Sequence, residues 1–539
     1  MMKFQSIWFF SWIFYQFRKF RNTFCCEFAL IFSHPQTGPF HKETIEFILC
    51  SGTDGSEYLN YKFSVIEDIM KLRTRITGLL IMVSMGLVIL PACQKDNNNG
   101  SDLPEDILIL DNWIWEGMNE VYLWEAYIPD LDPNQEPDPE AFFYKLLYKD
   151  DKNSWITDNY DELVAMFNGV QMSTGMSAQP VYYTGSQIIY FVEYVTPDSP
   201  AADSGIARGD IIYTIDGTLL DIDNYQSLYY QTTATFGFAD WNGSEMVPNG
   251  KNISLTAIVL DQDPIIYHDV IEYEGSKIGY LVYTQFTDGQ DGEWLDELNA
   301  VFEEFKTAGV SDVVLDLRYN PGGSLDLAAY FASTLAPALV MESNDVFVNL
   351  VWNDFYNQYW AEADLDDDGV ADGTDSKQLR IPLPHSDMNL DLTKVYFLTT
   401  RGTASASESL MAGLYPYMDV VQIGTTTYGK CYASITIDDW ERPKRHNWAM
   451  QPLVIKYSNA EGFTDFVGGI EPDITVEDNL LYAKPFGSLQ DPLLARALEE
   501  ITGVAPAATK SAQYLPAFKS LPVPRKPLDE WHADLPIGK

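Results

Sequence analysis

The sequence predicts a protein of the α/β fold class, a mixed α+β multidomain chain. We expect an N-terminal helical segment, then a β-rich domain, then a domain with a mainly parallel sheet flanked by helices. Apolar residues recur at helical spacing over residues 106–124 and 139–148. Short runs rich in β-branched and aromatic residues, separated by turn residues, fill 169–263. From 276 to 476 strand-like and helix-like runs alternate, which is typical of a parallel sheet covered by helices.

Composition sets limits on function before any motif is considered. The 539 residues are 46% hydrophobic and 21% charged, as in a globular protein with two or three domains. The chain has 34 basic and 78 acidic residues, a net charge of -44. This excess repels phosphate backbones, so we expect no nucleic acid as a partner. A well-solvated surface is the simplest interpretation of the acidic residues.

Residues 70–93 have the order of an export signal. Three basic residues precede an apolar run from Ile76 to Leu90, and the sequence Leu-Pro-Ala-Cys follows. This arrangement resembles the bacterial lipoprotein signal, which implies that 70–92 is a signal peptide and that Cys93 is lipidated. An uncleaved transmembrane helix is the alternative, but the run is short and the polar linker 93–105 follows it. We therefore expect an exported protein, held in the cell envelope at the periplasm or the surface, as on the outer membrane.

A signal peptide lies at the start of a protein, yet 69 residues precede Met70. We interpret 1–69 as upstream sequence translated in error, with Met70 as the natural start. An additional hydrophobic anchor around Ile7 to Phe17 is the alternative. Cleavage before Cys93 would leave Cys93 and Cys431 as the only cysteines, so no intramolecular disulfide is expected.

Within the β-rich domain, residues 195–217 read VTPDSPAADSGIARGDIIYTIDG. Ser-Pro-Ala predicts the start of a short helix that Gly205 ends, and Gly209-Asp210 leads into a strand. This segment resembles the PDZ domains of bacterial exported proteases. The resemblance implies a partner, because such domains bind peptide C-termini by adding a strand to a sheet edge. A purely structural β domain is the alternative. We place the helical domain at 106–168 and the PDZ-like domain at 169–263.

Ser405 is a candidate nucleophile because of its place in the chain. A strand ending in VYFLTT leads into RGTASASESLMAGL, so Ser405 lies where a helix begins. Unpaired N–H groups at a helix start stabilise negative charge on a hydroxyl or an oxyanion. An ordinary helix cap is the alternative for this serine.

Lys430, Gly322 and Gly323 are candidates for the remaining chemistry. Lys430 follows a strand and a glycine-containing turn, and a lysine can act as a base when burial lowers its pKa. A solvated surface lysine is the alternative. Gly322 and Gly323 follow the strand LDLRYNP and permit the backbone N–H to approach an oxyanion closely. A tight strand-to-helix turn explains these glycines equally well.

Four segments together resemble the C-terminal processing, or tail-specific, serine peptidases. They are DLRYNPGG, TASASE, GTTTYGK and GGIEPDITV, at 316–323, 403–408, 424–430 and 468–476. The resemblance implies a peptidase domain over 264–486. It makes Ser405 the nucleophile, Lys430 the general base and Glu408 the residue that supports the lysine, with Ala406 and Gly322 or Gly323 donating N–H groups to the oxyanion. Ser407 is a rival nucleophile, but only Ser405 keeps the family's interval to the lysine.

The implied activity is that of a serine endopeptidase which forms an acyl-enzyme and needs no cofactor. A histidine triad is the other serine mechanism, but His268, His385 and His446 lie in no triad motif. A catalytically idle scaffold that uses its PDZ-like domain to bind peptides is the alternative function.

An acidic segment at 364–375 suggests a second, structural site. Asp364, Asp366, Asp368, Asp372 and Asp375 follow the ligand order of a calcium loop, although an Asp replaces the usual terminal Glu. An Asp-rich solvated turn is the alternative. Residues 487–539 complete the chain with one expected helix and a Pro-rich tail.

Overall fold

The computed structural model describes residues 103–364, 370–371, 373 and 376–507, the strands 28–32, 44–50 and 58–64, and the short segments 518–521 and 529–530. The chain divides into two compact units, 1–100 with Lys539, and 101–538. The described part of the first unit is an antiparallel sheet of β1 (Phe28–Phe32), β2 (Thr44–Cys50) and β3 (Tyr58–Ser64). The expected signal peptide and Cys93 lie outside the described residues. Among the described helices, none has the length and apolar character needed to cross a membrane.

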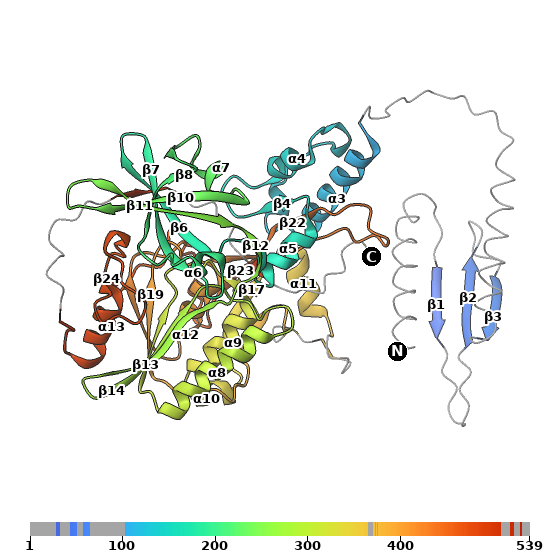
Figure 1. Cartoon of the computed structure of the whole chain (residues 1–539). Coiled ribbons are helices and arrows are strands. Elements are labelled where there is room, and N and C mark those ends of the chain that lie inside the picture. Colours follow the sequence, from blue (N-terminus) through green and yellow to red (C-terminus); the bar gives the residue numbers. More distant parts are fainter. Residues whose placement is uncertain are drawn as a thin grey trace. The chain divides into compact units, whose positions relative to one another are not determined.

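A β-rich domain occupies the part of the second unit where the sequence predicted one (Figure 1). Its sheet has the order β11-β10-β8-β9-β7-β6-β25. Ser199 caps its short helix α6, and Pro200 occupies the first helical position, as expected from Ser-Pro-Ala. The elements are β5 (Val170–Ser173), β6 (Met176–Thr184), β7 (Gln187–Val195), α6 (Pro200–Asp203), β8 (Ile211–Ile215), β9 (Thr218–Asp221), α7 (Tyr225–Tyr229), β10 (Thr233–Trp241), β11 (Met246–Thr256), β12 (Ile258–Asp261) and β25 (Lys519–Ser520).

The main sheet of the second unit has the order β13-β14-β15-β19-β20-β24. Only the pairing of β13 with β14 is antiparallel. The mixed α/β class with a mainly parallel sheet is therefore confirmed. The strands are β13 (Ile265–Tyr273), β14 (Ser276–Tyr283), β15 (Asp312–Asp316), β19 (Lys394–Thr399), β20 (Asp419–Gly424) and β24 (Ile474–Thr475).

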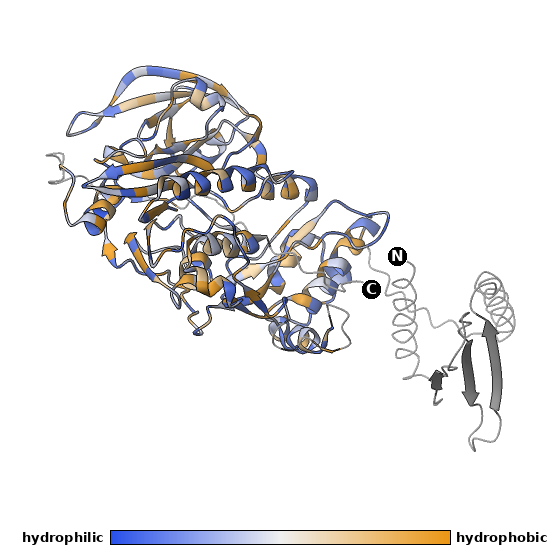
Figure 2. Cartoon of the chain, turned by 90° about the horizontal axis from the view of Figure 1, so that it is seen from below, coloured by the Kyte–Doolittle hydropathy of each residue, from blue (hydrophilic) through white to orange (hydrophobic). Residues whose placement is uncertain are grey.

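Helices cover both faces of this sheet. α8 (Glu293–Ala308), α9 (Leu325–Leu335) and α12 (Ala406–Leu414) share the largest apolar core with one face. α13 (Pro492–Thr502) packs on the other face, where Leu494 and Leu498 join Val314 and Ile423 in a separate core. The boundary drawn at 486 therefore separates α13 from the sheet that it covers. Figure 2 shows polar and apolar residues alternating along many of these elements, as expected when one side is buried.

The N-terminal helices share their apolar core with the main sheet. α3 (Glu105–Val121), α4 (Pro139–Leu146) and α5 (Tyr160–Phe167) follow the predicted helical segment, joined by the single turns η1 (Glu125–Tyr127) and η2 (Pro133–Gln135). Trp113, Met118 and Phe142 are buried in the same core as the main sheet. The aromatic residues at helical spacing are thus core residues. β4 (Trp155–Thr157) also pairs with β22 (Ala449–Gln451).

A second, antiparallel sheet in this unit was missed by the sequence analysis. It consists of β18 (Arg380–Pro382), β17 (Val346–Val351), β23 (Leu453–Ser458) and β21 (Tyr432–Ser434), in that order. Between β17 and β18 lies α11 (Asp354–Glu362), and α10 (Ala338–Glu342) precedes β17. The sheet brings β23 beside the segment that carries Lys430.

Buried ion pairs connect the β-rich domain to the end of β15. Arg318 donates to Asp316, Asp478 and Asp491, with the Asp478 and Asp491 contacts each at 3.1 Å. Arg208, from the turn before β8, donates to Asp478 at 2.8 Å. Because burial makes an unpaired charge costly, these contacts constrain the chain that follows Arg318, which carries Gly322 and Gly323.

Candidate active site

Adjacent parallel strands bring two of the predicted motifs together. β15 pairs with β19, so the loop Asn320–Gly323 and the turn that leads to Ser405 both lie at the carboxyl ends of central strands. Side chains at this edge of a parallel sheet are well placed to form a site. The amide N–H of Ala404 donates to the carbonyl of Asn320 at 3.0 Å, which joins the two segments directly.

Ser405 is the N-cap of α12 and is 4% exposed. Its backbone has φ 55° and ψ -113°, a conformation that costs a residue with a Cβ about 1–3 kcal/mol. Ala406, next in the chain, is the first helical residue, and an N–H at that position has no acceptor within its own helix. The strained turn thus presents the Ser405 side chain beside a helix start.

Asn320 connects the glycine loop to the serine turn through both its backbone and its side chain. Its carbonyl accepts from the Ser407 hydroxyl at 3.1 Å, and its Oδ1 accepts from the Gly322 N–H at 2.9 Å. The hydroxyl of the rival serine and the N–H of Gly322 are therefore both engaged.

The Glu408 carboxylate holds the main chain of both Ser405 and Lys430. Its Oε2 accepts from the Ser405 N–H at 2.9 Å and from the Lys430 N–H at 2.8 Å. Its Oε1 accepts from the Gly429 N–H at 2.7 Å and from the Thr427 hydroxyl. Burial raises the pKa of Glu408, and these four hydrogen bonds oppose that rise. Two residues 25 positions apart in the sequence thus share one oxygen atom as acceptor.

Tyr457, on β23, makes a second connection between the same two residues. Its buried hydroxyl lies 2.7 Å from the carbonyl of Lys430 and 3.2 Å from the carbonyl of Ser405. Ser405 and Lys430 are therefore held at both their N–H and their C=O groups. The second sheet, which sequence analysis missed, supplies this contact.

Lys430 is 1% exposed. Burial lowers its pKa to about 7, although the negative charges of Asp151 and Glu408 act in the opposite direction. Asp151 lies in the segment after α4, where it accepts from the Tyr122 hydroxyl at 2.7 Å and from the Ser154 N–H at 2.9 Å. A substantial fraction of Lys430 is consequently neutral at physiological pH, as a base requires.

Two glycines are required by close backbone contacts. A Cβ on Gly323, at φ 137°, would lie 2.1 Å from the carbonyl oxygen of Phe286. A Cβ on Gly429, at φ 97°, would lie 2.5 Å from the backbone nitrogen of Gly469. Other residues are excluded from both positions. The GGIEPDITV segment therefore packs against the lysine turn, where Ile470 also donates its N–H to the Thr427 hydroxyl at 2.7 Å.

The other candidate residues lie in different settings. His385 is exposed and contacts Asp387, His268 lies 3.6 Å from Glu304, and His446 packs on Trp113. Asp364 is exposed, and Asp366, Asp368, Asp372 and Asp375 lie outside the described residues, so the calcium loop stays a prediction. No group of three His, Cys, Asp or Glu side chains suited to a metal ion occurs in the described part of the chain.

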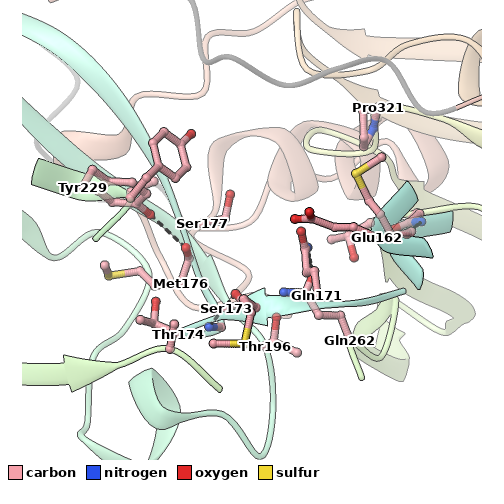
Figure 3. Close-up of a pocket in the computed structure, with 18 of the residues that line it drawn as sticks. Glu162, Gln171, Ser173, Thr174, Met176, Ser177, Thr196, Tyr229, Gln262 and Pro321 are labelled. Carbon is pink, nitrogen blue, oxygen red and sulfur yellow. Dashed lines mark hydrogen bonds between the residues drawn. The ribbon is translucent and has the colours of Figure 1, made fainter. Parts of the chain in front are cut away.

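A cavity of about 610 Å³ lies between the β-rich domain, α5 and the glycine loop (Figure 3). Ser173 lines it from the end of β5, Thr174 from the turn that follows, Met176 from the start of β6, and Tyr229 from α7. Its other walls include Glu162 and Pro321, the residue that precedes Gly322. The cavity therefore extends from the β6 edge to the loop of the candidate active site.

Comparison with known proteins identifies the family. Three family models match successive parts of the chain: the Peptidase S41 N-terminal domain at 110–160, a PDZ domain at 191–234, and Peptidase family S41 at 277–476. Residues 277–476 thus form a domain of peptidase family S41. The PDZ match falls within the β-rich domain, and the S41 match includes Ser405, Lys430 and both glycines.

Curated relatives and a solved structure agree with this assignment. A carboxy-terminal-processing protease of Bartonella bacilliformis is 26% identical over 300 residues, which are 54% of this chain and 59% of that protein. A carboxyl-terminal-processing protease of Picosynechococcus is 25% identical over 267 residues, 47% of this chain and 56% of the relative. The chain thus spans less than two thirds of either relative. The crystal structure of an S41-type protein from Bacteroides fragilis has a TM-score of 0.59 and 28% identity, covering 72% of this chain and 97% of that one.

Sequence reasoning did not assign roles to Asn320, Tyr457 and Asp151. Asn320 lies within the DLRYNPGG segment, so the motif itself contained the signal for one of them. Tyr457 and Asp151 carry no comparable signal, because their roles depend on pairing within the second sheet and on the packing of the N-terminal segment.

We expect Glu408→Gln to destabilise the S41 protein by about 2–3 kcal/mol, since a neutral amide offers one acceptor oxygen where the carboxylate accepts four hydrogen bonds. Urea denaturation at pH 7.5 measures the change. Glu471→Gln is the matched control, because that carboxylate is exposed and accepts from the Thr426 hydroxyl. Equal stability of both variants would contradict the central role given to Glu408.

Proposed function

We propose that this S41 protein is an exported, lipid-anchored serine endopeptidase that cleaves polypeptides, near their C-termini, with Ser405 as nucleophile and Lys430 as general base. The observation that carries the proposal is the joint attachment of these two residues to Glu408 Oε2, together with a lysine pKa of about 7. A buried neutral amine is suited to activating the hydroxyl of a serine at a helix start.

The proposed reaction begins when neutral Lys430 takes the proton from the Ser405 hydroxyl. The serine oxygen attacks the peptide carbonyl carbon, and the N–H groups of Ala406 and Gly323 stabilise the negative charge on the carbonyl oxygen. Protonated Lys430 then gives its proton to the leaving amine as the C–N bond breaks. Water hydrolyses the resulting ester with Lys430 again as base, which regenerates the serine. All these groups belong to the chain, so the proposed mechanism requires no cofactor.

The cavity supports a polypeptide substrate and a role for the PDZ domain in recognising C-termini. A peptide that adds to the β6 edge would have its end near the backbone of Ser173 to Met176, which lines the cavity. The same cavity reaches Pro321 and Tyr319, beside the oxyanion loop. A bound polypeptide could thus extend from the PDZ domain to Ser405 without leaving the protein surface.

Membrane attachment is proposed from the sequence order at 70–93. The basic stretch, the apolar run and Leu-Pro-Ala-Cys favour cleavage before Cys93 and lipidation of its sulfur. The protein would then face an extracytoplasmic compartment of the cell envelope, where polypeptide tails of exported proteins are accessible.

We expect Ser405→Ala to reduce hydrolysis of an unstructured polypeptide to the uncatalysed background. Ser407→Ala should keep activity within about tenfold of the unchanged protein, because the Ser407 hydroxyl donates to Asn320 and takes no part in the chemistry. Steady-state assays of both purified variants measure this difference. Equal and negligible turnover by the unchanged protein and Ser405→Ala would favour a peptide-binding scaffold instead.

The pH dependence of kcat/KM should follow the protonation state of Lys430. The base acts when neutral, so activity falls as pH decreases through about 7, by about tenfold per unit at lower pH. Asp151→Asn removes a charge that raises the pKa of Lys430, so the acid limb should move to lower pH. Asp150→Asn, at an exposed neighbour, should leave the limb in place. A flat profile from pH 5 to 8, or a limb that moves upward in Asp151→Asn, would contradict Lys430 as base.

Expression of the gene in a bacterium with a lipoprotein pathway should yield a mature protein whose first residue is a lipidated Cys93. Intact-mass measurement of the membrane fraction tests this. Cys93→Ser should leave the protein uncleaved or release it from the membrane, since the acylated sulfur is the proposed anchor. A mature chain that begins before Cys93 would refute the lipoprotein assignment.

A further inference from the structure

The chain's own C-terminal segment occupies the free edge of β6. β25 pairs antiparallel with β6, with Lys519 opposite Tyr182 and Ser520 opposite Val181. The N–H of Leu521 donates to the Pro180 carbonyl at 2.9 Å, and Gln179 Nε2 donates to the Leu521 carbonyl at 2.8 Å. This contact is the addition of a strand to a sheet edge, which is how extended peptides bind to PDZ domains.

Apolar side chains anchor the segment on the PDZ domain. Leu521 is 7% exposed and belongs to the core of that domain, with Met176 and Tyr190. Phe518 packs against Phe191 and Trp241, with ring centroids 5.7 and 6.3 Å apart. Burial of a leucine side chain stabilises such a contact by about 1.5–3 kcal/mol.

The segment from Lys519 to Leu521 runs along β6 in the direction expected for a peptide ligand of a PDZ domain. From Lys519 to Leu521 the chain runs past Tyr182, Val181 and Pro180, toward Met176 and the cavity at the start of β6. Pro522 follows Leu521 and has no N–H to continue the pairing. The segment therefore enters the peptide-binding edge from the same side as a substrate tail would.

A second contact places the same C-terminal region at the candidate active site. β26 (Asp529–Glu530) pairs parallel with β16 (Gly323–Ser324), and Gly323 lies opposite Asp529. β26 also lies beside β21, which begins two residues after Lys430. An extended substrate would also lie along the backbone at Gly323, the proposed oxyanion donor. β26 therefore lies where a substrate is expected.

From the juxtaposition of β25 with β6 and of β26 with β16, we propose that the segments 518–521 and 529–530 act as a tethered peptide ligand of this protein, which competes with substrate polypeptides for the PDZ edge and the active-site strand. The inference rests on the proposed peptidase function, and it specifies the ligand: an extended segment with a leucine that enters the PDZ core. Because the segment is attached, its effective concentration is in the millimolar range.

Peptide binding tests the proposal without relying on catalysis. In full-length Ser405→Ala protein, fluorescence anisotropy measures the affinity for a labelled synthetic peptide of sequence FKSLPVPRKPLDE, residues 518–530. Leu521→Asp, which removes the apolar anchor of the attached segment, should tighten peptide binding at least about tenfold by freeing the surface. Val504→Asp is the control, as it also replaces an apolar residue by aspartate, at an exposed position outside the contact.

Leu521→Pro provides a second variant, because it removes the N–H that donates to Pro180 while keeping an apolar side chain. Urea denaturation verifies that both variants remain folded. The proposal would be overturned if both Leu521 variants bound the labelled peptide with the same affinity as the Val504→Asp control. It would also be overturned if neither the Leu521 variants nor the control bound the peptide.

Activity assays separate this proposal from the peptidase function. With Ser405 intact, Leu521→Asp should lower KM at least about tenfold with little change in kcat, as expected when a competitor is released. Peptide binding that tightens as expected without any hydrolysis would refute the peptidase function and leave the ligand assignment standing. Hydrolysis that depends on Ser405 with an unchanged KM would refute the tethered ligand alone.

Discussion

The site depends above all on one buried carboxylate. Glu408 accepts hydrogen bonds from the N–H groups of Ser405 and Lys430 with a single oxygen, and from Gly429 and Thr427 with the other. Removing it would leave several buried donors without their acceptor. Glu408 is the third residue of the helix that Ser405 caps, so its hydrogen bonds tie together the serine, the start of α12 and the lysine turn.

Burial favours the neutral form of both ionisable groups of the site, but the surroundings of the two groups differ. For Lys430 it favours the neutral amine, with a pKa of about 7, which is the form that can accept a proton. For Glu408 burial alone would favour the neutral acid, but the four donors that surround the carboxylate stabilise its charge. The N-terminal segment contributes to this balance through Asp151. A segment distant in sequence thus adjusts the acid–base chemistry proposed for the lysine.

Local patterns in the sequence were sufficient to predict those features of the structure that form between residues close together in the chain. Alternation of strands and helices predicted the parallel sheet, and Ser-Pro-Ala predicted the start of α6. The motif residues Ser405, Lys430 and Gly323 lie at the ends of strands or in turns, as their flanking patterns predicted. Long-range pairing has no such local signal. The Tyr457 contact, the addition of β25 to β6, and the packing of α13 on the main sheet join segments that are far apart in the chain. For the same reason Glu408 was expected to support the lysine but not to hold its backbone.

A serine-reactive fluorophosphonate probe tests the central claim most directly, since it forms a covalent bond only with an activated serine oxygen. The full-length protein is incubated with the probe at a series of pH values, and the modified residue is located by peptide mass mapping. The account predicts a single label on Ser405, with a labelling rate that rises to half its maximum near pH 7 as Lys430 loses its proton. A label on Ser407, no label at all, or a rate independent of pH across this range would contradict it.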